Sequence, residues 1–365
     1  MMTARHRTVL VMAAGLLHVS TACAVDTSKA TQELQFSPNG QYVLAQDDAE
    51  ISVLSVQPLA VLFRIPADDA TDARFAADSL DVVVARSVTH ASEEKVTVAK
   101  SETCVERWSV LSRVRVRSLI IPTLACGTER LSPGGGVLAC VDFAGTLQLV
   151  DTTTGGTLLV KKRFAQPLVM FPPSPSRVPG GTTLINNNVG SADIGFSTDA
   201  QFLVAFPHAY GRSICWDLRN MKYLALNGGL REIRQGVPNN VHFAFISPDR
   251  LILASHGTFF AKGGLVSDKL VAVPSGRVLS ELRLPAGVLY RAADPGFVII
   301  RPFLEPGEAV QRAVAVELAT GEGIISETAA LDVLGRYYVA ESSPGVVGLY
   351  QRGKGLQATV TLHKK

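Results

Sequence analysis

One turn motif recurs along this chain and limits the folds that it can adopt. An apolar residue and a small residue precede a turn rich in Pro, Asp, Asn and Gly, and an apolar run follows; the seven copies begin at residues 36, 75, 131, 196, 246, 292 and 331. The copy at Phe36 reads FSPNG before QYVLA, and the copy at Phe196 reads FSTDA before QFLVA. Two apolar runs joined by such a turn are typical of a β-hairpin. The repeat therefore predicts seven similar β units with insertions of variable length between them.

The second half of each unit carries a second hairpin signal. In the third unit, TLQLV leads through DTTTGG into TLLVKK, and in the fifth unit KLVAV leads through PSG into RVLSEL. Glycine adopts positive φ without a Cβ clash, which a tight hairpin turn requires. No run of ten or more residues beyond the N-terminal segment has a helical apolar period. We therefore expect an all-β chain built from four-stranded antiparallel units.

The stretch Ser191–Leu224 shows the unit most clearly. Its opening F-S-x-D-x-x-x-L-V and its closing C-W-D-L resemble one blade of a WD40-type β-propeller. The seven meanders between residues 31 and 362 resemble a seven-bladed β-propeller of the WD40/YVTN type. This resemblance implies one domain over residues 25–365, with blades that begin near residues 31, 70, 124, 191, 241, 287 and 329. It also implies structural roles for five residues, in which the tryptophan packs between blades and the aspartates cap turns. These residues are Trp216, Asp217, Asp142, Asp199 and Asp249.

The ends of the repeat region leave ring closure open. The first unit carries its own first strand near residues 32–36, and the last carries its own fourth strand near residues 356–362. The ring then closes by packing of two complete units. The alternative is that residues 25–31 add a strand to the last unit, as terminal strands do in many propellers.

Residues 1–24 have the pattern of a signal peptide. Arg5 and Arg7 precede an apolar stretch from Val9 to Val19, and small residues follow. The A-x-A pattern at residues 22–24 predicts cleavage before Val25 and a free periplasmic or secreted protein. The sequence STAC at residues 20–23 also resembles a bacterial lipobox, which makes Cys23 a candidate for lipidation and an outer-membrane lipoprotein the alternative. The only membrane contact that we expect is this anchor.

Four cysteines remain after such a cleavage, at positions 104, 126, 140 and 215. An exported protein is free to form disulfides, and four cysteines allow three complete pairings. Cys140 and Cys215 lie in apolar runs, where a buried thiol acts as a small hydrophobic group. The sequence alone does not choose among these pairings. If one bridge forms, we expect Cys104–Cys126, because both residues lie outside the predicted strand cores.

The lengths of the connections point to one functional face. The turns within each hairpin pair are short, whereas the connections from second to third strands, and from one unit to the next, hold the long insertions. The longest insertion, at residues 166–190, is rich in proline. Long loops on a rigid scaffold often carry binding residues, although they are also where insertions without a partner accumulate. The binding candidates on these loops are His90, His208, Tyr210, Arg212, His256, Phe259, Phe260 and Lys262.

These side chains predict binding rather than chemistry. The aromatic residues would stack on a ligand or close the mouth of a central channel. The histidines come from different units without ligand spacing, so we expect no metal and no cofactor. The net charge of +3 and the lack of a basic, aromatic stripe exclude a nucleic-acid partner.

No P-loop, G-x-S-x-G, H-E-x-x-H or G-x-G-x-x-G after a strand is present, and we expect no catalytic residue. We therefore expect a monomeric, non-catalytic exported propeller that binds a protein or cell-envelope component through its loop-rich face. The alternatives are a lactonase-like periplasmic hydrolase or lyase that acts at the central channel, and a purely structural member of an envelope assembly.

Overall fold

The described part of the chain is entirely β-strands and turns. The computed structural model describes residues 33–89, 101–121, 126–142, 145–162, 192–207, 214–224, 241–255, 268–282, 288–291, 297–301, 314–317, 323–326, 328–332 and 334–363. Their strands form seven antiparallel sheets, each made of four consecutive strands. The expected all-β chain of four-stranded antiparallel units is thus confirmed.

The sheets are numbered in chain order. Sheet 1 contains β1 (Glu33–Phe36), β2 (Tyr42–Gln46), β3 (Glu50–Val56) and β4 (Leu59–Pro66). Sheet 2 contains β5 (Ala70–Phe75), β6 (Asp81–Thr89), β7 (Ser101–Ser109) and β8 (Arg115–Ile121). Sheet 3 contains β9 (Cys126–Leu131), β10 (Val137–Asp142), β11 (Leu147–Asp151) and β12 (Thr157–Lys161). Sheet 4 contains β13 (Ala192–Phe196), β14 (Phe202–Pro207), β15 (Ile214–Asp217) and β16 (Lys222–Leu224).

Sheets 5 to 7 follow the same order. Sheet 5 contains β17 (Val241–Ser247), β18 (Arg250–Ser255), β19 (Asp268–Ala272) and β20 (Val278–Leu282). Sheet 6 contains β21 (Val288–Arg291), β22 (Phe297–Arg301), β23 (Val314–Glu317) and β24 (Gly323–Ile325). Sheet 7 contains β25 (Ala329–Leu331), β26 (Tyr337–Ser343), β27 (Val346–Gln351) and β28 (Gly355–Thr361).

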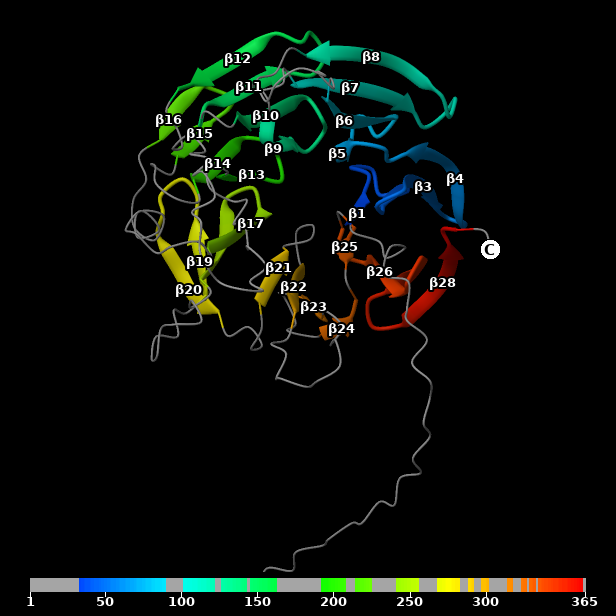
Figure 1. Ribbon diagram of the computed structural model, residues 1–365. Helices are drawn as coiled ribbons and strands as arrows, with labels where there is room; N and C mark the ends of the chain where they lie inside the picture. The colour runs from blue at the N-terminus through cyan, green and yellow to red at the C-terminus, as the bar shows by residue number, and fades with distance from the viewer. Residues whose placement is uncertain are drawn as a thin grey trace, which may run out of the picture.

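Figure 1 shows the seven sheets side by side around a common centre, with the first strand of each sheet inside and the fourth strand outside. The first strands of neighbouring sheets contact one another, for example β5 with β9 and β9 with β13. The fourth strands are mostly exposed along their length, as the burial of β8 and β12 illustrates. The arrangement is consistent with a β-propeller.

The inner strands read as continuous apolar runs because both of their faces are covered. In β6, Val82 and Val84 pack into a cluster shared with sheet 1, whereas Val83 and Ala85 pack into a cluster shared with sheet 3. All four side chains are almost completely buried. Each fully buried Val or Leu contributes about 1.5–3 kcal/mol to stability. Neighbouring sheets are thus held together mainly by apolar packing.

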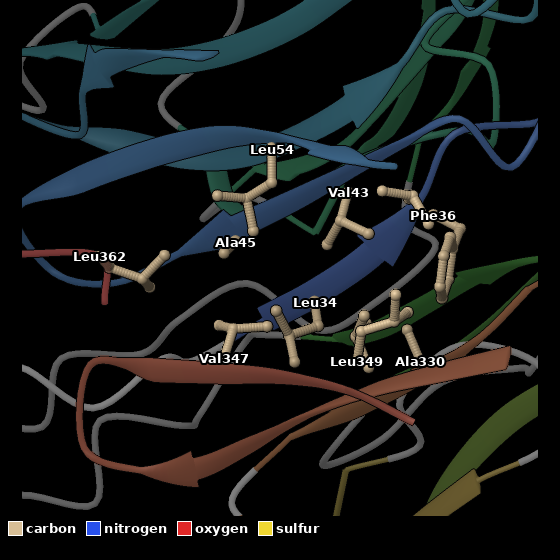
Figure 2. Packing of buried hydrophobic residues seen from close by; sticks show 11 residues of the cluster. Leu34, Phe36, Val43, Ala45, Leu54, Ala330, Val347, Leu349 and Leu362 are labelled. Carbon is tan, nitrogen blue, oxygen red and sulfur yellow. The ribbon is translucent and has the colours of Figure 1, made fainter. Parts of the chain in front are cut away.

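Sheet 7 packs against sheet 1. Figure 2 shows Leu34 and Phe36 of β1 facing Val347 and Leu349 of β27, with Leu362 at one side of the cluster. The backbone oxygen of Leu362 accepts a hydrogen bond of 2.5 Å from Nη2 of Arg64, which lies in β4. Both sheets are built from their own four consecutive strands.

The recurrent turn motif has a shared hydrogen-bond pattern. The Ser37 hydroxyl donates to Oδ1 of Asn39 at 2.7 Å and accepts from the amide of Tyr42 at 2.9 Å. Ser197 repeats this pattern, donating to Oδ1 of Asp199 and accepting from the amide of Phe202 at 2.8 Å. The serine thus satisfies the first amide of the second strand, which explains its place in the motif.

The cysteine pairing differs from the sequence-based expectation. The disulfide joins Cys126 of β9 to Cys140 of β10, with their Cα atoms 5.6 Å apart. Cys104 is a free thiol in β7, and its sulfur lies 3.3 Å from the hydroxyl oxygen of Ser118. The expected Cys104–Cys126 bridge was wrong because both residues belong to strands. Cys126 lies in β9, which pairs with β10, the strand of Cys140, whereas β7 with Cys104 belongs to another sheet.

Candidate functional site

Two faces of the molecule differ in their connections. The short-turn face, as we name it, carries the turns from first to second and from third to fourth strands, such as residues 37–41 and 110–114. The long-loop face carries the other connections. Among these is the segment between β12, which ends at Lys161, and β13, which begins at Ala192. Insertions therefore gather on one face, although residues 47–49 and 67–69 are short connections there.

The binding residues expected from the sequence lie outside the described residues. The described strands fix only where their loops begin and end; for example, β14 ends at Pro207 and β15 begins at Ile214. The same applies to the Pro-rich insertion at 166–190, the N-terminal segment and its cleavage sites. The residues concerned are Cys23, His90, His208, Tyr210, Arg212, His256, Phe259, Phe260 and Lys262.

The five blade-signature residues lie in packing or turn positions. Trp216 is 8% exposed and packs in the cluster between sheets 3 and 4. Oδ1 of Asp217 accepts hydrogen bonds from the amides of Arg219 and Asn220, and the hydrogen bond from the Asn220 side chain is the main cause that lowers the pKa of Asp217. Oδ1 of Asp142 accepts from the amide of Thr146 at 2.7 Å. Asp199 and Asp249 accept from the serines of their own turns.

Charged side chains on the inner strands connect sheets 1, 2 and 3. Arg74 of β5 forms an ion pair with Glu33 of β1 and lies 3.1 Å from Oδ1 of Asp72. Oδ2 of Asp72 accepts a hydrogen bond of 2.8 Å from the amide of Leu131 in β9. Burial raises the pKa of Asp72 more than the nearby Arg74 lowers it. Because both oxygens of this buried carboxylate are engaged, Asp72 joins sheets rather than facing a ligand.

A second carboxylate of the inner region is held in the same way. Oε2 of Glu129 accepts a hydrogen bond of 2.7 Å from the hydroxyl of Thr71, and Oε1 accepts one of 2.5 Å from the hydroxyl of Thr103. Glu129 belongs to sheet 3 and both threonines belong to sheet 2. The glutamate is 7% exposed. It therefore adds a polar connection between two sheets.

A third carboxylate lies near the outer edge, in a hollow of about 640 Å³ between sheets 1 and 2. Glu106 of β7 accepts hydrogen bonds from Arg86 at 2.9 Å, Arg115 at 2.6 Å and Nε1 of Trp108 at 3.0 Å. Burial raises the pKa of Glu106, but these three hydrogen bonds outweigh it and lower the pKa. Arg86 also donates to the backbone oxygens of Pro66 and Asp68, so the cluster fixes the connection between the two sheets.

A second hollow, of about 740 Å³, opens on the short-turn face where sheets 7, 1 and 2 meet. Its floor is the first turn of sheet 1 with Tyr42, and its sides are turns of sheets 2 and 7. Arg113 and Arg336 line it from these two sides. Sequence reasoning missed both arginines because it concentrated on the long loops.

Among the described residues, no three His, Cys, Asp or Glu side chains gather as a metal site would require. Within the same ranges, no helix is long and apolar enough to cross a membrane. A scan against protein-family models finds no matching family, and a search of curated proteins finds no significantly similar sequence.

Proposed function

We propose that the chain is an exported, closed seven-bladed β-propeller of the WD40/YVTN type, in which the seven sheets are the blades. It binds a protein or cell-envelope component through the long-loop face and catalyses no reaction. The observation that carries this proposal is the distribution of connections, because the long insertions gather on one face of a scaffold whose other face has only short turns. Scaffold folds commonly carry binding residues on such loops.

The inner carboxylates support a binding rather than a catalytic role. A propeller hydrolase or lyase needs acids and bases that face the channel with room for a substrate. Asp72 and Glu129 instead have both oxygens engaged by neighbouring strands. The alternative is a hydrolase or lyase that acts at the central channel. It would be favoured by a hydrolase or lyase activity that an Asp72→Asn variant loses while its fold is unchanged.

Loop deletion tests the binding proposal. Residues 172–180 would be deleted, and the loops at 208–212 and 256–264 replaced by short Gly-Ser linkers, singly and together. We expect the triple variant to lose its partner from an envelope extract, identified by mass spectrometry and reciprocal capture, with little change in Tm. Met221→Gly, on the short-turn face, is the control that keeps capture. Capture that survives all three changes would refute the binding role of this face.

The mature N-terminus is a separate test of export. Mass spectrometry of the protein from its own cells would find either Val25 as the first residue or a lipidated Cys23. A mature protein that still begins at Met1 would contradict export through this segment.

A further inference from the structure

The hollow on the short-turn face has matching rims on two sheets. Its rim in sheet 2 is Leu111–Arg113 in the turn before β8, and its rim in sheet 7 is Leu334–Arg336 in the turn before β26. Each rim reads Leu-x-Arg. Leu111 is 70% exposed and Leu334 is 67% exposed, the two highest values among the large hydrophobic side chains whose burial is described. Leucines this exposed on two sides of one hollow offer apolar surface that a bound segment could cover.

The two arginines of the rims are available to a ligand. Within the described part of the chain, the guanidinium groups of Arg113 and Arg336 form no ion pair and no hydrogen bond. Asp332, the acidic residue that lines the same hollow, is occupied by its own turn, since Oδ1 accepts from the amides of Arg336 at 2.6 Å and Tyr337 at 3.1 Å. Two unpaired cations on one hollow favour a negatively charged occupant.

Arg113 also occupies a backbone position that costs stability. Its φ is +61°, and its amide donates to the backbone oxygen of Ser109 at 2.8 Å. Gly155 of sheet 3 and Gly276 of sheet 5 hold the same place in their turns, with the same hydrogen bond four residues back and φ of +75° and +69°. An arginine in the left-handed region is strained where glycine is not.

The floor between the rims is held in place before any ligand arrives. The amide of Asn39, in the first turn of sheet 1, donates to the hydroxyl of Ser79 in sheet 2 at 3.1 Å. The rim in sheet 7 is held as well, since Nη1 of Arg352 donates to the backbone oxygen of Gly335 at 3.1 Å. A preformed site loses less conformational entropy when a ligand binds.

We propose that this hollow binds an extended acidic segment of a partner protein. Carboxylates of the segment pair with Arg113 and Arg336, and its apolar side chains pack on Leu111 and Leu334. The two rims belong to sheets on either side of sheet 1, so the occupant has to cross the turn at residues 37–41. A free phosphate or carboxylate would use the arginines but not the leucines. The site lies opposite the long loops and does not depend on their proposed role.

Selection from a phage-displayed library of random linear peptides tests this site. The full chain is the target, and the Arg113→Glu/Arg336→Glu variant is the matched target. We expect the wild type to select peptides in which Asp or Glu alternates with apolar residues, and the variant to lose them. Fluorescence polarisation with a labelled selected peptide should show binding weakened about tenfold or more by the double variant. Higher salt should also weaken it.

Arg113→Gly separates binding from folding. Removing the strained side chain should keep or raise Tm, because glycine adopts this φ freely, while it weakens peptide binding by about tenfold. Met221→Gly changes the equivalent turn position of sheet 4, where φ is +48°, and should leave binding unchanged. Arg277→Glu, a charge reversal in the turn of sheet 5, should also leave it unchanged.

Several outcomes would overturn the proposal. The selection could yield no peptide, or peptides without acidic residues. A selected peptide could bind the Arg113→Glu/Arg336→Glu variant as tightly as the wild type, or it could bind the wild type equally well after its Glu residues are replaced by Gln. If free phosphate displaces the peptide completely and binds as tightly as the peptide does, the hollow is a simple anion site instead.

Discussion

Buried charges on this molecule hold sheets together, and Glu106 is the clearest single residue of this kind. Its carboxylate is reached by two arginines and a tryptophan, and through Arg86 it is connected to the backbone of the link between sheets 1 and 2. Glu106 is 5% exposed. Removing one member of such a buried group leaves the others without partners, which costs more than the net value of the pair.

Glu106→Gln should therefore lower the free energy of unfolding by about 2–3 kcal/mol at neutral pH. The pKa of Glu106 lies below the ordinary 4.5, so its charged form stabilises the folded protein above that pH. This contribution is lost as the pH falls through 4.5 towards the folded pKa. The variant should lose less stability than the wild type between about pH 5 and pH 3, measured by urea unfolding.

Arg115→Gln is the control for this prediction. The Arg115 side chain is 52% exposed, so solvent screens its pairing and the loss should stay below about 1 kcal/mol. If the wild type and Glu106→Gln lose the same stability between about pH 5 and pH 3, another carboxylate governs the loss of stability in acid.

At the scale of strands and turns, neighbouring sheets also meet through their turns. Gly134 of sheet 3 forms a parallel bridge with Ala76 of sheet 2, and Thr152 donates a 2.5 Å hydrogen bond to the backbone oxygen of Gly135. A Cβ at Gly135 would lie 2.6 Å from Cγ2 of Val83, and its φ is +65°. The turn can approach sheet 2 only because this residue has no side chain.

Gly135→Ala should cost about 3 kcal/mol, because the added methyl group meets Val83 in the cluster between sheets 2 and 3 and the backbone is strained. Gly40→Ala is the matched variant. Gly40 has a similar φ of +70° but nothing within 4 Å of the added Cβ, so only the backbone cost of about 1 kcal/mol applies. Thermal unfolding of both proteins measures the difference, and equal losses would contradict a steric role for Val83.

Local turn chemistry explains why the strand pattern could be predicted. Ser37 and Ser197 satisfy the first amide of the next strand from within their own turn, so the signal is contained in a few adjacent residues. The disulfide could not be predicted, because it depends on the pairing of β9 with β10 rather than on spacing.

The hollow on the short-turn face was missed for a similar reason. It joins turns from sheets 7, 1 and 2 that lie far apart in the sequence. One signal was available: the turn of sheet 2 reads VLSRV, without the glycine found in TTTGG and PSG. The expected binding loops lie outside the described residues, so their roles stay predictions.

At the scale of the whole molecule, the packing of sheet 7 on sheet 1 joins the two ends of the repeat region. Leu362 is 1% exposed in the shared cluster, and its backbone oxygen accepts from Arg64. Nε2 of His363 lies 2.9 Å from Oδ2 of Asp47. Leu362 and His363 thus contribute to the environment of sheet 1.

Leu362→Asp should lower stability by about 4 kcal/mol or more, since it places a charge in an apolar cluster. Leu356→Asp, on the same edge at 52% exposure, should cost below about 1 kcal/mol. Hydrogen exchange should report the first change in both sheets, with faster exchange at the amides of β1 and β2 as well as β27. Faster exchange confined to sheet 7 would contradict the coupling.

This contact also sets an order for biosynthesis. Arg64 and Leu362 are separated by 298 residues, so the ribosome completes sheet 1 long before its apolar partners exist. Until β27 and Leu362 emerge, the nascent chain exposes the face formed by Leu34, Phe36 and Val43. Contacts between such distant segments form slowly, and an exposed apolar strand in the meantime invites aggregation or chaperone binding. Sheet 1 is therefore synthesised before the other described sheets, yet its apolar face is covered only after the last of them is made.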